Sequence, residues 1–289
     1  MILVAGGTGR LGSLIVRRLT QRGMDVRVLT RDPSVAAPDH VQVIVGDVRD
    51  RGSLGPATAG VDLVVSAVHG FVGPRGISPE TVDRDGNANL VDAARAAGAG
   101  FVLMSVVGAS PDSPMELFRM KHAAEQHAAA SGVPTTVVRA TAFLELWIDL
   151  LTQIAARSGR PLVFGGGDNP INFVSVNDVA ALLERVITDP ATRGQTVEIG
   201  GPENVTFNAL ARSVQAAAGR SSTHRHVPVA MLHLMAGTVG RVKPGLGRQA
   251  RAAIALDGGD FTFDALPIHR RYPDLPMTSL GDVLSHSRV

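Results

Sequence analysis

Short apolar runs rich in β-branched residues alternate with helical segments through the first half of the chain. The runs that predict strands are residues 1–5, 25–30, 41–46, 61–67, 100–106 and 135–140. The segments with apolar residues at helical spacing are 10–23, 87–100 and 121–132. Gly23, Gly98 and Gly132 end these segments, where a left-handed glycine commonly closes a helix. Nearly continuous apolar strands between helices predict an α/β fold with a parallel sheet covered on both faces.

The pattern changes after residue 140. The apolar segment 143–156 predicts a helix, and a stretch punctuated by Gly and Pro follows it. Further predicted elements are a helix at 176–189, a strand at 195–200 and a helix at 207–219. The last seventy or so residues contain broken apolar pieces and basic loops. Within them, residues 241–251 form a local basic cluster that we interpret as a solvated loop, with a phosphate site as the less favoured alternative.

Composition excludes several classes of function. The 289 residues are 45% apolar, enough for a sizeable core, and the absence of cysteine excludes thiol catalysis, thiolate metal sites and disulfides. Lys and Arg number 28 against 26 Asp and Glu, and there are only 11 Phe, Tyr and Trp residues, so we expect no nucleic-acid partner. The opening "MILVAGG" is not a signal peptide, and no apolar run is long enough to span a membrane. We expect a cytoplasmic protein with no membrane partner.

A glycine motif follows the first predicted strand. Gly6, Gly9 and Gly12 give the spacing G-x-x-G-x-x-G immediately before an amphipathic helix. Glycines in this context let backbone N–H groups at a helix N-terminus approach a pyrophosphate that β-carbons would block. The motif predicts dinucleotide binding, and a glycine turn without a ligand is the alternative.

The end of the second predicted strand bears on the choice of dinucleotide. An acidic residue at this position favours NAD, whereas arginine accommodates the 2′-phosphate of NADP. Arg31 therefore favours NADP(H) over NAD(H), although Asp32 follows it and a solvated surface arginine is the alternative. Asp47 and Val48 end the third strand, where they would lie near the adenine; Asp47 is equally interpretable as a helix-capping acid.

The whole chain resembles the atypical short-chain dehydrogenases/reductases, specifically the NmrA-like NAD(P)-binding proteins. The motifs that carry the resemblance are "GGTGRLG", "LTRDP", "GDVRD", "GNANLVDAARAAG", Ser105, Lys121, "VVRATAFLE" and "FVSVNDVA". The resemblance implies a doubly wound (Rossmann) dinucleotide-binding domain over 1–140, with its sheet completed by 176–200. It also implies a smaller C-terminal substrate-binding region, residues 141–175 and 201–289, and a cleft that holds the nicotinamide.

Functional residues follow from the same resemblance. The predicted cofactor-binding residues are Gly6, Thr8, Gly9, Arg10, Leu11, Gly12, Arg31, Asp47, Val48, Ala67, Lys121 and Ala140. The predicted catalytic residues are Lys121, Ser105 and His69. Phe143 and Trp147, at the start of the apolar segment after residue 140, are predicted to contact substrate, with core packing as the alternative.

Lys121 lacks its usual partner. Ordinary members of the superfamily carry a catalytic tyrosine four residues before this lysine, but Leu117 occupies that position and the only tyrosine is Tyr272. Lys121 is expected to bind the nicotinamide ribose and, in an apolar cleft, to act as an acid or base. A lysine on an exposed helix face is the alternative.

His69 follows the fourth predicted strand. Carboxyl ends of strands form the ligand crevice in such sheets, so His69 is a candidate proton donor, and a loop histidine that binds backbone is equally expected. No metal site is predicted, because His122 and His127 do not share a helix face and the histidines at 224, 226 and 233 have no carboxylates near them in sequence.

These features favour an NADP(H)-dependent oxidoreductase that acts on a hydrophobic carbonyl or a quinone-type aromatic molecule. A quinone suits the missing tyrosine, because its reduced oxygens need a weaker acid. A non-catalytic NmrA-like sensor of NAD(P) is the alternative, and sugar-nucleotide epimerase chemistry ranks low because it relies on the same tyrosine. A homodimer is left open.

Overall fold

The computed structural model describes residues 1–35, 40–74, 76–220 and 223–286. The chain forms two compact units. The first unit comprises Met1–Ala140 and Val179–Glu198, and the second comprises Thr141–Asp178 and Ile199–Val289. None of the described helices has both the length and the apolar character needed to cross a bilayer.

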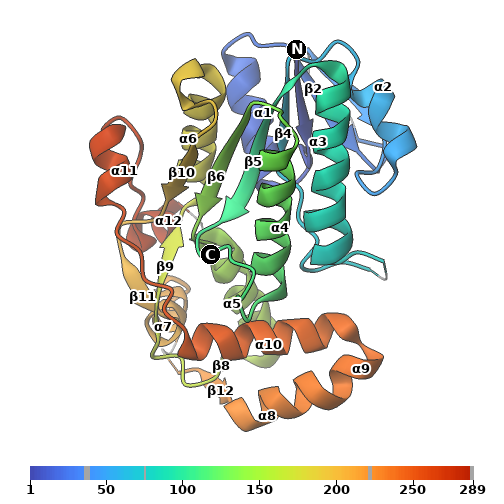
Figure 1. Ribbon diagram of the computed structural model, residues 1–289. Helices are drawn as coiled ribbons and strands as arrows, with labels where there is room; N and C mark the ends of the chain where they lie inside the picture. Colours follow the sequence, from blue (N-terminus) through green and yellow to red (C-terminus); the bar gives the residue numbers. More distant parts are fainter. Residues whose placement is uncertain (36–39, 75, 221–222, 287–289) are drawn as a thin grey trace. The chain divides into compact units, whose positions relative to one another are not determined.

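A seven-stranded parallel sheet is the centre of the first unit, which confirms the predicted doubly wound α/β fold (Figure 1). Its strands run in the order β10-β6-β5-β4-β1-β2-β3. The chain adds β2 and β3 on one side of β1 and then β4, β5 and β6 on the other, so the topological switch point lies between β1 and β4. The strands are β1 (Ile2–Ala5), β2 (Val26–Thr30), β3 (Val41–Val45), β4 (Leu63–Ser66), β5 (Gly100–Val106), β6 (Thr135–Ala140) and β10 (Thr196–Ile199). Strand β1 pairs in parallel with β2 on one side and β4 on the other. Its residues are all buried, as the continuous apolar run predicts.

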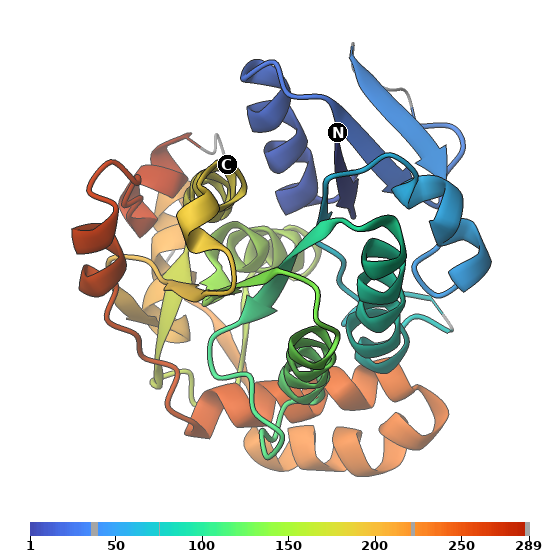
Figure 2. The same cartoon turned by 45° about the horizontal axis from the view of Figure 1, so that its top comes forward.

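Helices cover both faces of this sheet. They are α1 (Arg10–Gln21), α2 (Leu54–Thr58) after the short η1 (Arg51–Ser53), α3 (Asp85–Ala97), α4 (Glu116–Ala130) and α6 (Val176–Thr188), with the short η3 (Pro190–Thr192) before β10. Figure 2 shows α3 and α4, in teal and green, on one side of the sheet, and α1 and α6, in dark blue and yellow, on the other. Glu184 of α6 joins the latter pair, because its carboxylate accepts hydrogen bonds from Arg18 of α1 and from Arg22, which follows that helix.

Helix boundaries agree with the glycine signals at the C-terminal ends. Gly23, Gly98 and Gly132 have φ of +72°, +68° and +77°, the left-handed region that glycine adopts most readily. The starts differ from the prediction. Helix α4 begins at Glu116 instead of residue 121, and α3 is preceded by one π-helical segment, η2 (Pro79–Arg84). Single π turns of this kind frequently occur at functional sites.

The second unit has two small sheets and a set of helices. Its elements are β7 (Ala142–Phe143), α5 (Leu144–Ser158), β8 (Leu162–Phe164), β9 (Pro170–Val174), β11 (Asn204–Thr206), α7 (Phe207–Ala217), β12 (Arg225–Val227), α8 (Val229–Leu234), η4 (Met235–Val239), α9 (Gly240–Val242), α10 (Pro244–Gly258), α11 (Leu266–Arg271) and α12 (Leu280–His286). The buried Asn172 ties them together, because its amide oxygen accepts from Gly201 N and Thr141 Oγ1. The prediction of a solvated loop at 241–251 is wrong, since α9 and α10 run through it: Pro244 occupies the first turn of α10, where its missing N–H costs nothing.

Candidate functional site

The turn between β1 and α1 is built so tightly that only glycine fits. Gly6 has φ of +82°, and a β-carbon there would lie 2.7 Å from the carbonyl oxygen of Ala67. A β-carbon on Gly12 would lie 2.1 Å from the oxygen of Gly6, so any side chain would push α1 away from the turn. Gly7, which sequence reasoning left out, is also closely packed, because a β-carbon there would lie 2.9 Å from the side chain of Val28.

The N-terminus of α1 faces this turn without a protein cap. Gly9 is the N-cap residue and offers no side chain, and the first turn contains no acidic residue. Thr8, Gly9 and Arg10 are exposed, whereas the Leu11 side chain is buried and anchors the helix to the core. The first N–H groups of a helix have no partner within the helix, and the helix dipole favours an anion beside them. This turn therefore fits a pyrophosphate, the group that the glycine spacing predicts.

Arg31 lies exposed just beyond β2, and its neighbour Asp32 is engaged locally. The carboxylate of Asp32 accepts from the backbone N–H and the hydroxyl of Ser34, and these hydrogen bonds lower its pKa. Asp32 is thereby committed to its own turn, which leaves the Arg31 guanidinium as the charged group at the end of the strand. The structure thus leaves an exposed arginine at the carboxyl end of β2.

Asp47 and Val48 follow β3 and are held by different contacts. Arg49 binds the Asp47 carboxylate at 2.6 Å, and these hydrogen bonds hold the pKa of Asp47 below its usual range, against the opposing effect of burial. Asp47 does not cap the helical turn that follows; Asp50 does, by accepting from Gly52 N. The Val48 side chain belongs to the core, and its carbonyl accepts from the side-chain amide of Asn89.

Lys121 is not on an exposed helix face. Its side chain is 4% exposed, and its ammonium donates to the carbonyls of Met104 at 2.9 Å and Val68 at 3.2 Å. The carboxylate of Asp83, from the π-helical segment η2, lies 3.0 Å away and is fully buried. The other carboxylate oxygen of Asp83 accepts from Gly70 N at 2.8 Å. Lys121 and Asp83 together hold the segment 68–70 that follows β4.

His69 is the residue that this clamp presents to solvent. Its side chain is 49% exposed, and its Nδ1 lies 3.9 Å from the Asp83 carboxylate. Protein packed around the rest of the ring desolvates it and lowers the pKa of the imidazole, Asp83 opposes this shift, and Lys121 adds to it. Asp83 Oδ1 has no aligned hydrogen bond among the described residues, so it retains capacity to accept one.

Ser105 points into a separate buried network. Its hydroxyl donates to Glu125 at 2.5 Å, one helical turn beyond Lys121, and Arg139 binds the same carboxylate at 2.6 Å. Ser105 is 1% exposed, and its hydroxyl is bonded to Glu125, away from the Lys121 ammonium and its Asp83 partner. The structure therefore brings Lys121 and His69 together through Asp83 and places the Ser105 hydroxyl elsewhere.

The remaining positions near the strand ends are backbone features or apolar. Ala67 donates its N–H to Ala5 at the end of β1, and Ala140 is buried at the end of β6. Leu117, at the position of the usual tyrosine, is buried on α4, and Tyr272 is buried in the second unit. No described residue supplies a phenol beside Lys121.

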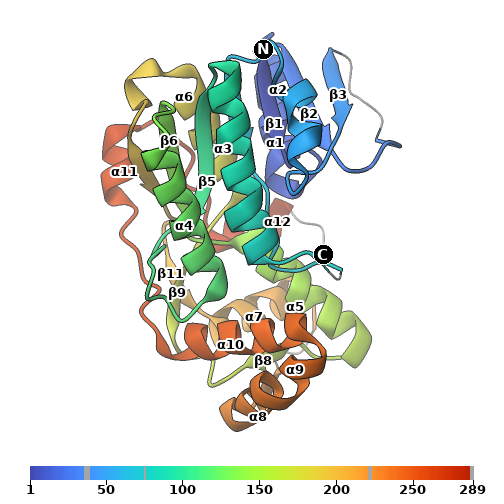
Figure 3. The same ribbon diagram turned by 45° about the vertical axis from the view of Figure 1, so that its right-hand side comes forward.

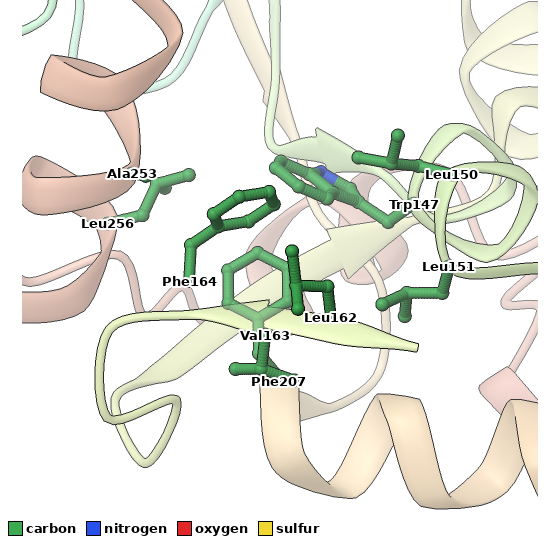
Figure 4. Close-up of a pocket in the computed structure, with 9 residues that line it drawn as sticks. All are labelled: Trp147, Leu150, Leu151, Leu162, Val163, Phe164, Phe207, Ala253 and Leu256. Carbon is green, nitrogen blue, oxygen red and sulfur yellow. The ribbon is translucent and has the colours of Figure 1, made fainter. Parts of the chain in front are cut away.

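An apolar pocket lies within the second unit, with about 330 Å³ of non-atom space that includes open solvent. Figure 4 shows its lining residues, Trp147, Leu150, Leu151, Leu162, Val163, Phe164, Phe207, Ala253 and Leu256. Trp147 packs edge to face on Phe207, with ring centroids 4.7 Å apart. Phe143 is half-buried and precedes α5 as its N-cap residue. Trp147 thus serves both the core and the pocket wall.

Asp83 and Glu125 are the residues that sequence reasoning missed. A signal for both exists in the helical spacing. Asp83 and Asn87 are in phase with the buried Leu90, just as Lys121 and Glu125 are in phase with the buried Ala128. Polar residues that continue a buried stripe are expected to be paired inside the protein. Among the described residues no group of His, Asp and Glu is arranged to hold a metal ion.

Comparison with known proteins identifies the family. The model of the NmrA-like family matches residues 1–241. The chain belongs to the NmrA-like family. An NAD(P)H azoreductase of Xenophilus azovorans is 32% identical over 224 residues, which cover 76% of this chain and 74% of that protein. Membership of the NmrA-like family, together with this similarity, identifies the chain as an oxidoreductase.

Two solved structures share the fold over nearly the full length. An NADPH-dependent quinone oxidoreductase from Escherichia coli, complexed with NADPH, aligns with a TM-score of 0.80 at 24% identity and covers 99% of each chain. A triphenylmethane reductase from Citrobacter sp., complexed with NADP(H), aligns with a TM-score of 0.80 at 21% identity, over 99% of this chain and 100% of that chain.

Proposed function

We propose that this protein is an NADPH-dependent oxidoreductase that reduces a small, apolar, aromatic compound of the quinone type. The observation that carries the proposal is the glycine turn from Gly6 to Gly12, where β-carbons on Gly6 and Gly12 would clash with backbone, beside a helix N-terminus without a side-chain cap. The names of relatives support the same class: one is an NAD(P)H azoreductase, another an NADPH-dependent quinone oxidoreductase, and another a triphenylmethane reductase.

The cofactor would be held mainly by backbone groups. The turn around Thr8 and Gly9, with Arg10, Leu11 and Gly12 in the first helical turn, would bind the pyrophosphate. Arg31 would bind the 2′-phosphate, which favours NADP(H) over NAD(H). Asp47, Val48, Ala67 and Ala140 would line the rest of the cofactor. When bound, the nicotinamide ring supplies the hydride.

We assign the proton to His69 and a positioning role to Lys121. Reduction of a quinone by hydride also requires a proton, and Leu117 cannot supply one. His69 is half-exposed, and an imidazole can donate a proton when it is charged; desolvation lowers the pKa of this ring, so donation is favoured toward acidic pH. Lys121 is enclosed by two carbonyls and the Asp83 carboxylate, so in this structure it acts on the segment that carries His69. Lys121 would reach a ribose hydroxyl only by giving up one of these contacts, and Ser105 would support the strand through Glu125.

The substrate would be apolar and flat. Phe143 and Trp147 remain our candidates for contact with it, and the pocket wall that Trp147 shares with Phe164 and Phe207 is of matching character. Aromatic rings in such a wall favour offset or edge-to-face packing against a planar ligand.

Substitution of Gly9 tests the cofactor assignment. Gly9 has φ of −78° and ψ of 172°, which any residue adopts, and its β-carbon would lie 3.3 Å from Gly6 O. Asp is a good N-cap residue, so Gly9→Asp should leave the protein folded while its carboxylate occupies the anion site. We expect NADPH affinity, measured by calorimetry, to fall on the order of 100-fold, because like charges placed together cost several kcal/mol.

Gly9→Asn is the matched control. Asn caps a helix equally well and has the same shape without the charge, so it should weaken NADPH binding much less than Asp. Equal affinity of the Asp variant and the wild type would contradict the proposed phosphate site. Steady consumption of NADPH with a panel of quinones would then separate a reductase from a redox sensor, which binds the dinucleotide without turnover.

A further inference from the structure

Charge is strongly segregated along this chain. Residues 204–256 contain seven of the 28 Lys and Arg residues and none of the 26 Asp and Glu residues. The rest of the chain therefore has 21 basic and 26 acidic residues and a net charge of −5. The overall balance of +2 conceals a continuous stretch of 53 residues with a formal charge of +7.

The helices α8, η4, α9 and α10, residues 229–258, form most of this stretch, and we refer to them as the helical arm. Figures 1 and 3 show α8 lying alongside α10 within the arm. Close packing at the bend holds the two together, because a β-carbon on Gly247 would lie only 2.5 Å from the Cα atom of Gly240. Leu232 of α8 is 1% exposed, so the arm has a defined inner side.

The outer side of the arm carries exposed apolar side chains. Met231, Leu234, Val239 and Val242 are 52%, 63%, 38% and 82% exposed. Their spacing along the chain is three, five and three residues. The step of five falls on the π-helical segment η4, whose wider turn takes roughly one residue more than an α-helical turn. The four side chains therefore lie along one face, which we call the apolar stripe.

Cations accompany the stripe. Arg241 and Lys243 flank Val242 in sequence, and Arg251 of α10 is exposed, with its guanidinium close to Gly247. Arg225, in the strand β12 that leads into the arm, is exposed as well. An apolar face bordered by Lys and Arg is the pattern of a helix that lies in the interface of an anionic bilayer.

We propose that the helical arm binds the surface of membranes that contain anionic lipids, with the apolar stripe inserted at the level of the headgroups and the flanking cations on lipid phosphates. No spanning helix is involved. Nucleic acid fits less well, because the exposed side chains of the stripe are aliphatic or Met and no aromatic residue is exposed along it. A second copy fits less well, because two such surfaces would repel each other.

Sedimentation of the full chain with lipid vesicles tests the proposal. We expect binding to vesicles of phosphatidylcholine with phosphatidylglycerol, weak binding to phosphatidylcholine alone, and loss of binding as salt is raised. Arg241→Gln with Lys243→Gln should weaken binding on the order of 10-fold or more, and Leu234→Gln with Val242→Gln should weaken it comparably.

A matched control removes two exposed cations from the other unit. Arg17→Gln with Arg95→Gln lowers the net charge equally but should leave vesicle binding unchanged, and circular dichroism and turnover should stay normal in all three double variants. Three results would overturn the proposal. The first is an equal loss of vesicle binding in the Arg17 and Arg95 control variant. The second is tight binding to duplex DNA that is unaffected by the Leu234 and Val242 substitutions, and the third is a dimer in sedimentation velocity that those substitutions dissociate.

Discussion

The glycine turn and the Lys121 cluster lie at the ends of neighbouring strands but use opposite means. The turn after β1 uses glycines where β-carbons would clash, leaves Thr8, Gly9 and Arg10 exposed and offers main-chain N–H groups. The cluster after β4 buries charged side chains and satisfies them with one another, as Lys121 does with Asp83. Open backbone is suited to bind a ligand, whereas a closed ion pair is suited to hold a loop in place. This difference suits the glycine turn to ligand binding and the Lys121 cluster to positioning of the loop after β4.

The largest effect should come from opening the cluster. Asp83→Ala removes the carboxylate that pairs with the Lys121 ammonium among the described residues and leaves a buried charge uncompensated. Breaking a buried pair in this way typically costs about 3–5 kcal/mol, measured here as the loss in free energy of unfolding in urea. Asp83→Ala combined with Lys121→Met should recover much of that loss, because the unpaired charge is gone. If the double variant were no more stable than Asp83→Ala, the ion pair would not be what holds the segment 68–70.

A smaller effect is expected from substitution of Arg31. Arg31→Ala should weaken NADPH binding by about 1.5–3 kcal/mol, roughly 10- to 100-fold, because it removes a charge-assisted hydrogen bond to the 2′-phosphate. NADH binding should change little. Calorimetry with both dinucleotides measures the ratio, and Arg17→Ala on the exposed side of α1 serves as the control. An unchanged ratio would show that Arg31 is only a surface residue.

The pH dependence of turnover should report His69. Desolvation places the folded pKa of His69 below its usual 6.5, so the ring loses its proton as pH rises through that lower value. Turnover limited by proton donation should therefore increase as pH falls below about 6.5, and His69→Gln should flatten the profile. Stability should move the opposite way and decrease as the pH falls. Above pH 6.5 the folded and unfolded states are both neutral, and below it the unfolded state binds a proton first. A profile that keeps its slope in His69→Gln would assign the proton to another group.

The smallest effect should be at Ser105. Loss of its hydroxyl in Ser105→Ala should cost about 1 kcal/mol of stability, because Glu125 keeps its bonds to Arg139. Turnover with a quinone should remain near that of the wild type. A fall in kcat of two orders of magnitude without a change in stability would instead place Ser105 at the reacting atoms.

How far sequence could predict this structure depended on the physical nature of each feature. Local patterns predict the parallel sheet and the helix ends at Gly23, Gly98 and Gly132, because strand burial and left-handed helix caps each depend on residues that are close together in sequence. Helical spacing indicates that Asp83 and Lys121 are buried, but it does not indicate that they meet, because 38 residues separate them along the chain. Likewise, the helix over 244–258 was missed because basic and glycine residues there suggested a loop.

Gly9, the N-cap residue of α1, has no side chain to accept hydrogen bonds from the first N–H groups of the helix. If the diphosphate of a bound dinucleotide accepts them instead, then dinucleotide binding stabilises the folded state. At a free concentration of 100 times the dissociation constant, a ligand of this kind adds about 2.7 kcal/mol to the folded state. The lifetime of the protein in a cell would then track the size of the nicotinamide pool, quite apart from any turnover.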